Sequence, residues 1–493
     1  MIIAALRVLV NEESFRKLLS RIMPALLRHN MRVIRLPQEA AMPSSSLLTA
    51  PVKPLILKTA LPSMLATISS ALCALLDALL LARFGAGHTA AAAVSFPLLA
   101  IIQTLGFTLG MGAGSFVSRC LGSKEHEAAH TAASTAFFLA LGISGLLCGA
   151  GFFLAAPLAA LLGASGDALV PAAAYARYVL LSGPLLCISL VLSSLLRALG
   201  KTIPNMIAFV SGCAAGIVLQ FSLIPRLGVH GAGISMLARE GITLSLLICF
   251  VLRADSLIRP VFRAVSLRLD VFRDIMRSGS PTLLRQGLMS VSSIMLTRTS
   301  AVFGEAALAG MGLSARALSL VSSSVIGFGQ GFQPVCGAAF GAGDMERVRS
   351  AYRFCMRVVV VSLLIAGAAL FFAARPLLHL FSAEDAALEI ANSALRAQSV
   401  VLFAQGAVIM MNMLTQAAGM TLRASFIASS RQGFVFIPLI LLLPRHFGIS
   451  GLILCQSISD LISLALCLLV MRGVIKDCAC ARGGCWDARK ASQ

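Results

Sequence analysis

Long apolar stretches recur from one end of this chain to the other, and they decide what it can fold into. Each is about 18 residues or longer, enough for a helix to cross the ~30 Å hydrocarbon core of a bilayer. Only 12% of the 493 residues are charged, about half of the roughly 25% that is usual in soluble domains. A soluble chain of this length would lack the polar residues to cover its surface. The sequence therefore predicts an all-α, polytopic membrane protein.

Glycine and proline mark most of the boundaries between these stretches, as in "FGAG", "LIPRLG" and "LLPRHFG". Length and hydrophobicity between the boundaries indicate helices. We expect twelve transmembrane helices, at residues 55–83, 88–118, 129–155, 171–197, 201–224, 230–252, 278–302, 307–339, 348–373, 389–417, 421–443 and 448–472.

Basic residues lie mainly between the apolar stretches, and they account for the formal net charge of +20. Because Lys-rich and Arg-rich loops stay in the cytoplasm, this distribution indicates membrane topology rather than nucleic-acid binding. The loop after the sixth helix is the most basic, with Arg253, Arg259, Arg263, Arg268, Arg273 and Arg277. We therefore expect a multi-pass protein of the plasma (inner) membrane with both termini in the cytoplasm. Arg226, Arg375 and Arg445 are exceptions to the rule.

Glycine, proline and neighbouring residues recur in the two halves of the chain at a shift of 219 residues, so the halves are related by an internal repeat. The matching pairs are Pro62 with Pro281, Phe84-Gly85 with Phe303-Gly304, Gly122 with Gly341 and Pro225-Arg226 with Pro444-Arg445. After one inserted residue, Glu240 meets Asp460. Since each half has six helices, an even number, both halves have the same orientation, as in a parallel repeat.

We accordingly divide the chain into an N-terminal extension (1–54), an N-lobe (55–252), a cytoplasmic linker (253–277), a C-lobe (278–472) and a tail (473–493). Two related bundles suit alternating access, with the substrate site between them near the membrane middle. A membrane enzyme is the main alternative, but no HExxH sequence, intramembrane aspartate pair or Ser/His couple is visible. We expect a transporter and not an enzyme.

Several segments together resemble the multidrug and toxic compound extrusion (MATE) family. They are "PSMLATISSALCALLDALLLARFGAGHTAAAAVSFP" (62–97), "GMGAGSFVSRCLGSKEHEAA" (110–129), "LRALGKTIPNM" (196–206), "GFGQGFQPVCGAAFGAGDMERVR" (327–349) and "SRQGFVFIPLILLLPRHFGISGL" (430–452). The resemblance covers about residues 55 to 475. It implies a V-shaped transporter of two six-helix lobes that exports amphipathic, often cationic organic compounds, driven by inward flow of Na⁺ or H⁺.

The resemblance also implies the partners. They are small organic substrates and the lipid bilayer, with a functional monomer and no cofactor besides the coupling ion. The alternative within the same broader fold is a flippase for a lipid-linked precursor or a polysaccharide. Such a protein would line its cavity with basic residues, and Arg285, Arg298, Arg316 and Arg431 keep that alternative open.

Asp77 is an acid inside an otherwise apolar run. A charged aspartate at the centre of a membrane helix costs about 2.5–3.5 kcal/mol, so it should face the bundle interior or a water-filled cavity. The MATE resemblance implies that Asp77 binds the coupling ion. Where many relatives have Asn and Asp in the fifth helix, this chain has Gly216 and Gln220. Because Na⁺ prefers several oxygen ligands, we favour H⁺ over Na⁺, with Gln220 as the partner of Asp77.

The other polar residues inside predicted helices are candidates for a substrate pocket or a structural network. Glu240 and Asp460 are repeat-related, and we expect them to pair with cations such as Arg285 or Arg431. We expect Arg239 to point away from its neighbour Glu240. Arg285 with Gln286, and Arg431, can line the pocket or hold the C-lobe together. Asn412 stands among three methionines in "MMNM", which suit either a promiscuous pocket or helix packing.

The two ends of the chain differ from the rest. Residues 1–41 have a basic amphipathic pattern foreign to the family, and we expect that they come from an over-long gene model starting ahead of Met42. Cys478, Cys480 and Cys485 near the C-terminus lack the fourth ligand and the spacing of a zinc site. We therefore expect no metal there.

Overall fold

The computed structural model describes residues 46–83, 86–162, 169–253, 260–261, 264–265, 269–378 and 385–480. No strand occurs in these residues. A helix satisfies all of its backbone polar groups internally, which is what a segment surrounded by lipid requires. The predicted extension 1–41 and Cys485 fall outside the described residues, as do the side chains of Cys478 and Cys480.

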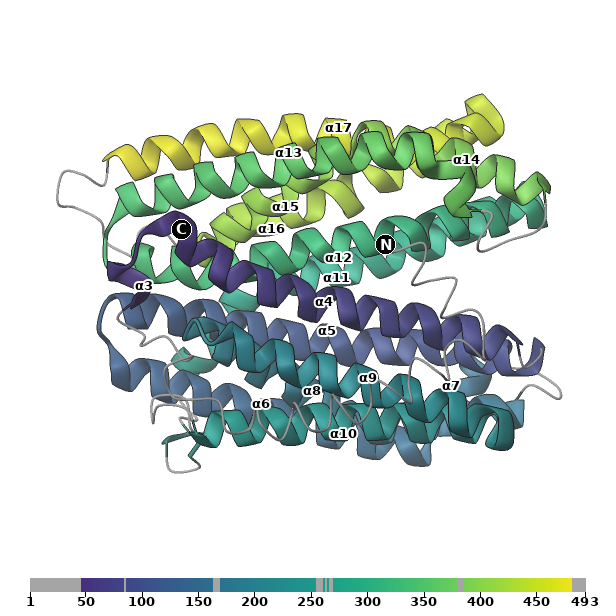
Figure 1. Ribbon diagram of the computed structural model, residues 1–493, viewed down its shortest axis with the longest axis horizontal. Helices are drawn as coiled ribbons and strands as arrows, with labels where there is room; N and C mark the ends of the chain where they lie inside the picture. The colour runs from purple at the N-terminus through teal and green to yellow at the C-terminus, as the bar shows by residue number, and fades with distance from the viewer. Residues whose placement is uncertain are drawn as a thin grey trace.

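The first half of the chain forms one bundle. Its helices are α3 (Ser46–Thr49), α4 (Val52–Arg83), α5 (Ala86–Gly122), α6 (His126–Phe153), α7 (Ala155–Leu161), α8 (Leu169–Ala198), α9 (Thr202–Leu227) and α10 (Val229–Arg253). The second bundle has α11 (Leu269–Val302), α12 (Glu305–Gly341), α13 (Met345–Leu378), α14 (Asp385–Val400), α15 (Leu402–Ala417), α16 (Thr421–Ser429), the π-helix η5 (Ser430–Phe434) and α17 (Phe436–Cys480). The bundles lie side by side, with α4 at their boundary (Figure 1).

The predicted arrangement of twelve transmembrane helices in two related lobes is confirmed. Within the described residues, nine helices are long and apolar enough to cross a membrane, and the pair α14 and α15, bent by 56°, makes a tenth. The stretch Thr421–Gly473 contains two spans, because Gly448 interrupts the helical backbone. The remaining span is α11, whose four arginines lower its hydropathy.

Some helix boundaries differ from the prediction. The tenth span is not one straight helix, because Val401 breaks it. The eleventh contains the π-helix η5, which no periodicity had indicated. Helix α11 begins at Leu269, so the second part of the predicted linker is helical, and α17 continues into the predicted tail.

The internal repeat is visible in the backbone conformation as well as in the amino-acid sequence. Gly228 and Gly448 occupy equivalent places and both have left-handed backbone angles, with φ of 53° and 58°. Residues with a side chain rarely adopt this conformation. The glycine therefore lets the chain turn back directly into the last helix of each lobe.

Close contact between the lobes is concentrated toward one end of the bundle. We call it the linker end, where α10 ends at Arg253 and α11 begins at Leu269; the opposite end is the far end. Gly122 touches the carbonyl of Ala338, and Gly341 touches that of Arg119, so closely that a Cβ atom would collide. Thr59 donates a hydrogen bond to the carbonyl of Gly331 at 2.9 Å.

Further from the linker end, Thr67 donates to the carbonyl of Ser323 at 2.9 Å. Beyond that contact, the same face of α12 continues through Ser319, Arg316 and Gly312, all of which are exposed. The lobes are therefore closed against each other at the linker end, and this face of α12 is uncovered toward the far end.

Candidate functional site

Three helices of the N-lobe bring the polar residues of the candidate site together. Asp77 lies near the end of α4, Gln220 near the end of α9, and Arg239 in the first half of α10. Six residues separate Asp77 from Arg83 and ten separate Arg239 from Val229. At a rise of 1.5 Å per residue the site is about 10–15 Å from the far end of the helices. The site is therefore inside the bundle, but closer to the far end than to the linker end.

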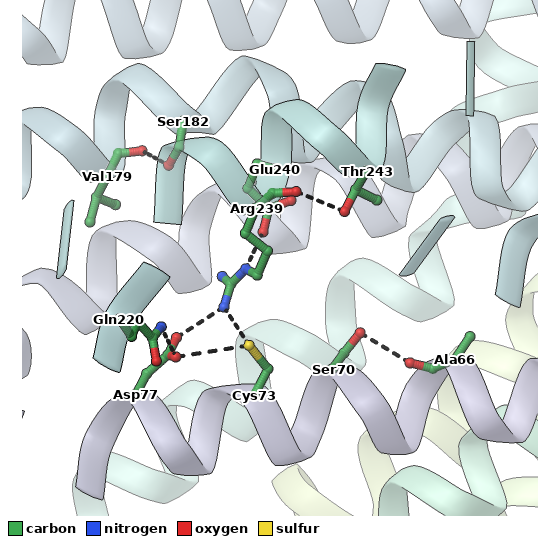
Figure 2. A network of polar contacts seen from close by, with 10 residues as sticks. All are labelled: Ala66, Ser70, Cys73, Asp77, Val179, Ser182, Gln220, Arg239, Glu240 and Thr243. Atoms are coloured by element: carbon green, nitrogen blue, oxygen red, sulfur yellow. Dashed lines mark hydrogen bonds and ion pairs between the residues drawn. The ribbon is translucent and has the colours of Figure 1, made fainter. Parts of the chain in front are cut away.

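Asp77 accepts hydrogen bonds from two helices (Figure 2). The side-chain amide of Gln220 donates to Oδ1 of Asp77. Nη1 of Arg239 forms an ion pair with Oδ2 of Asp77 at 2.9 Å, and it also reaches Sγ of Cys73 at 3.2 Å. The predicted contact between Asp77 and Gln220 is therefore present in the structure, whereas Arg239 is a partner that the sequence analysis missed.

Arg239 also bonds to its neighbour in the sequence. Its Nε lies 3.0 Å from Oε1 of Glu240. The expectation that the two side chains point apart is wrong, and so is a pairing of Glu240 with Arg285 or Arg431. Adjacent residues diverge at Cβ, but a long arginine side chain can curl back toward its neighbour. Arg239 is thus held between two carboxylates from different helices.

Gly216 makes room for this arrangement. A Cβ atom at Gly216 would lie 3.1 Å from both Cβ and Cδ of Arg239, which is tighter than an ordinary van der Waals contact. The arginine side chain therefore crosses α9 at the residue where a larger side chain would push it away. The apparent loss of a polar ligand at Gly216 and the presence of Arg239 are two parts of one arrangement.

The three charged side chains of this group are largely buried, so an unbalanced charge among them is energetically costly. The side chains of Asp77, Arg239 and Glu240 are 23%, 14% and 8% exposed. Two ionised carboxylates and one guanidinium leave one negative charge. An uncompensated charge away from water costs several kcal/mol, so a small cation or proton is drawn to such a group. An arginine inside a membrane helix was the one sequence signal that could have revealed this.

The C-lobe contains a separate ion pair. Nε of Arg431 lies 2.6 Å from Oδ1 of Asp460, and the amide of Gln456 donates to the same oxygen at 3.0 Å. The expected pairing of Asp460 with Arg431 is therefore present. Arg431 belongs to η5, and its carbonyl accepts a hydrogen bond from Ser459. The side chain of Asp460 is only 4% exposed, which suits a contact that holds helices together.

The remaining predicted polar residues do not join the Asp77 group. Asn412 is buried inside the C-lobe and donates to the carbonyl of Ala424 at 2.8 Å, so it holds α15 against α16. The neighbouring Met410, Met411 and Met413 are buried with it, which favours packing over a pocket. Arg285 and Gln286 lie on α11, and Nε of Arg285 is buried without a hydrogen-bond partner.

No group of three or more His, Cys, Asp or Glu side chains that could hold a metal ion occurs among the described residues. At the Asp77 site the oxygen donors are two carboxylates, both bonded to Arg239, and Oε1 of Gln220, which is buried without a partner. The group therefore offers a metal ion few oxygen atoms that are free of other partners.

Comparison with known proteins agrees with this architecture. The model of the MatE family matches residues 62–222 and 281–442. The two matches begin 281 − 62 = 219 residues apart, which is the shift found within the sequence. The multidrug export protein MepA of Staphylococcus saprophyticus is 25% identical over 415 residues, which is 83% of this chain and 91% of the relative. MepA of Staphylococcus aureus is 26% identical over 429 residues, 85% of this chain and 94% of the relative.

Solved structures show the same fold. An outward-facing multidrug resistance transporter of the MATE family has a TM-score of 0.83 and 23% identity, and the match covers 88% of this chain and 98% of that one. The Vibrio cholerae MATE transporter VcmN in its bent form has a TM-score of 0.79 and 21% identity, with 89% and 99% covered. The fold is that of a multi-pass membrane transporter rather than an enzyme. The chain belongs to the MatE family, as its motifs and repeat predicted.

Proposed function

We propose that the protein exports amphipathic, cationic organic compounds from the cytoplasm by alternating access, in exchange for protons. The observation that carries the proposal is the group of Asp77, Arg239 and Glu240, a net negative charge inside the N-lobe of a transporter fold. Export of several drugs is what the MepA relatives are named for. The amphipathic nature of the substrates comes from the family resemblance.

The positive-inside rule supports one orientation of the transporter in the membrane. The arginine-rich segment that joins the lobes supports a cytoplasmic linker end, with both termini on the same side. Contacts such as Gly122 with Ala338 and Gly341 with Arg119 close that end. The uncovered face of α12 toward the far end then supports an outward-facing state, from which substrate leaves and protons enter. We place the protein in the plasma (inner) membrane as a functional monomer that binds small molecules and no nucleic acid.

The partners of Asp77 favour H⁺ over Na⁺. A sodium ion would need several oxygen ligands around it. Arg239 already occupies Oδ2 of Asp77 at 2.9 Å, and Gly216 offers no ligand. A proton needs only one oxygen. It neutralises the single negative charge of the group without competing for the space that Arg239 fills.

Exchange follows from competition for this one charge. With both carboxylates ionised, the group attracts an organic cation into the space between the lobes. When a proton binds Asp77, the attraction is lost and the ion pair with Arg239 weakens, because a neutral carboxyl group accepts a weaker hydrogen bond. The N-lobe therefore has two discrete states, with substrate favouring one and a proton the other.

The test is efflux of a fluorescent organic cation from proteoliposomes, with the pH gradient and the Na⁺ gradient collapsed separately. We expect transport to stop when the pH gradient is removed and to continue without Na⁺. The variant Asp77→Asn should lose the dependence on the pH gradient. Transport driven by a Na⁺ gradient alone would contradict proton coupling, and full coupled transport by Asp77→Asn would contradict the role of the carboxylate.

A second candidate is a flippase for a lipid-linked precursor. The observation that favours it is Arg316, an exposed cation on the face of α12 that continues the contact between the lobes. The same proteoliposomes decide between the two. A flippase would move an anionic lipid-linked saccharide and leave the fluorescent cation in place.

A further inference from the structure

A second polar site lies between the lobes at the linker end, away from Asp77. It is a cavity of about 20 Å³ lined by residues of α5, α8 and α12. Six of the ten lining residues are polar: Ser115, Ser118, Ser194, Arg197, Gln330 and Gln333. Gln330 is next to Gly331, which packs on Ala60 of α4. Seventeen residues of α4 separate Ala60 from Asp77, or about 25 Å along the helix, so the two sites are distinct.

Arg197 gives the cavity a positive charge that no acid balances. Its residue is only 7% exposed. Its guanidinium donates to the hydroxyls of Ser193 and Ser194 and approaches Sδ of Met111 at 4.0 Å. Within the part of the chain that the structure describes, it makes no ion pair with a carboxylate. Of its five N–H groups, two have no acceptor among the described residues.

Two further side chains in the cavity have hydrogens to donate. Ser194 accepts from Arg197 at 2.8 Å, and its own hydroxyl hydrogen has no acceptor among the described residues. Gln330 is 4% exposed, and its amide makes no hydrogen bond to any described residue. These three donors line the cavity, so each can donate a hydrogen bond to an acceptor held there, in place of a partner from the protein.

The chemistry of these donors selects the acceptor. An unbalanced guanidinium, a hydroxyl and an amide N–H all bind an anion, and no carboxylate lines the cavity to repel one. The volume exceeds the ~10–15 Å³ that a single water-sized sphere requires, but it is too small for an organic substrate. We propose that this cavity binds one small monovalent anion of the size of chloride.

The position of the site gives the anion a function. Arg197 and Ser194 belong to the N-lobe, whereas Gln330 belongs to the C-lobe. All three can contact one ion only while the lobes are closed at the linker end. A ligand that binds one state shifts the equilibrium toward it, by about a hundredfold when its concentration is a hundred times its Kd. Chloride therefore stabilises the state in which the linker end is closed.

Chloride binding to the purified full-length protein tests the proposal. Binding of ³⁶Cl⁻ is measured together with the midpoint of thermal unfolding in sodium chloride, bromide and gluconate at equal ionic strength. We expect one saturable chloride per chain and a midpoint that rises by several degrees in either halide but not in gluconate. In crystals grown with bromide, anomalous scattering should place the ion beside Arg197.

Three variants separate the anion from water and from a folding defect. Ser194→Ala and Gln330→Leu each remove a donor and should weaken ³⁶Cl⁻ binding at least tenfold. Ser118→Ala is the matched control in the same cavity, because its hydroxyl already donates to the carbonyl of Ser115 at 3.0 Å, and its binding should be unchanged. No saturable chloride binding in the wild type, or equal binding in all three variants, would overturn the proposal and leave the cavity to water.

Discussion

Arg239 and Asp77 form one ion pair, but removing either partner should have very different consequences. The wild-type group of Asp77, Arg239 and Glu240 carries one net negative charge. Asp77→Asn brings it to zero, because Arg239 keeps Glu240 at 3.0 Å and the new amide still accepts hydrogen bonds. Arg239→Gln leaves the carboxylates of Asp77 and Glu240 without their shared cation, a net charge of −2.

The magnitudes follow from burial. Breaking a buried pair by removing one partner costs about 3–5 kcal/mol. The 23% exposure of the Asp77 side chain places Arg239→Gln near the lower limit, at about 3 kcal/mol. Asp77→Asn exchanges charged hydrogen bonds for neutral ones, at about 1 kcal/mol. The difference of about 2 kcal/mol corresponds to a roughly thirtyfold difference in the folding equilibrium.

The assay is reversible unfolding of both variants in mixed micelles of increasing denaturing detergent, followed by efflux from proteoliposomes. Arg298→Gln is the control, because Arg298 is an exposed arginine of the C-lobe. We expect Asp77→Asn to remain folded and to lose proton coupling, and Arg239→Gln to be strongly destabilised. Equal destabilisation by Asp77→Asn and Arg239→Gln, or a stable and fully active Arg239→Gln, would refute the charge argument.

Three other substitutions test separate parts of the structure. Gly216→Val should push Arg239 off Asp77 and reduce efflux about tenfold, as expected for 1–3 kcal/mol of overpacking, whereas Gly241→Val, with open space around it, should transport normally. Asp460→Asn should lower stability by about 3 kcal/mol through the loss of its buried partnership with Arg431, measured by the same unfolding assay, while proton coupling in the folded fraction stays intact. Gly341→Leu should prevent the linker end from closing. A labelling reagent added on the cytoplasmic side should then reach the contact between the lobes in the variant and not in the wild type. Protection equal to that of the wild type would show that this contact does not close the pathway.

The contacts of the candidate site were only partly predictable from the sequence. Asp77 and Gln220 stood out because a polar residue in an apolar span must find a partner, and their contact is present. Arg239 was passed over because helix geometry separates adjacent residues at Cβ and does not account for the reach of a long side chain. The same reasoning predicted the pairing of Asp460 with Arg431, since a buried acid needs a cation and few basic residues lie inside the predicted helices.

The sequence by itself determined the membrane class, the number of spans and the two-fold repeat. These depend on local quantities: the length of an apolar run, the residue type at a turn, and the sequence spacing between repeat-related residues. Gly228 and Gly448 show how far such information extends, because one unusual backbone conformation recurs wherever the repeat demands it.

Only the tertiary structure decided what the polar residues do. Packing α4, α9 and α10 together brought side chains that are far apart in the sequence into one group with a single net charge. It also showed why residue 216 is a glycine, because a larger side chain there would crowd Arg239. Packing α5 and α8 against α12 likewise buried Arg197 beside a cavity that no carboxylate of the described residues lines. The energy of a charge depends on what lies within a few ångströms of it in space, and that cannot be obtained from distance along the chain.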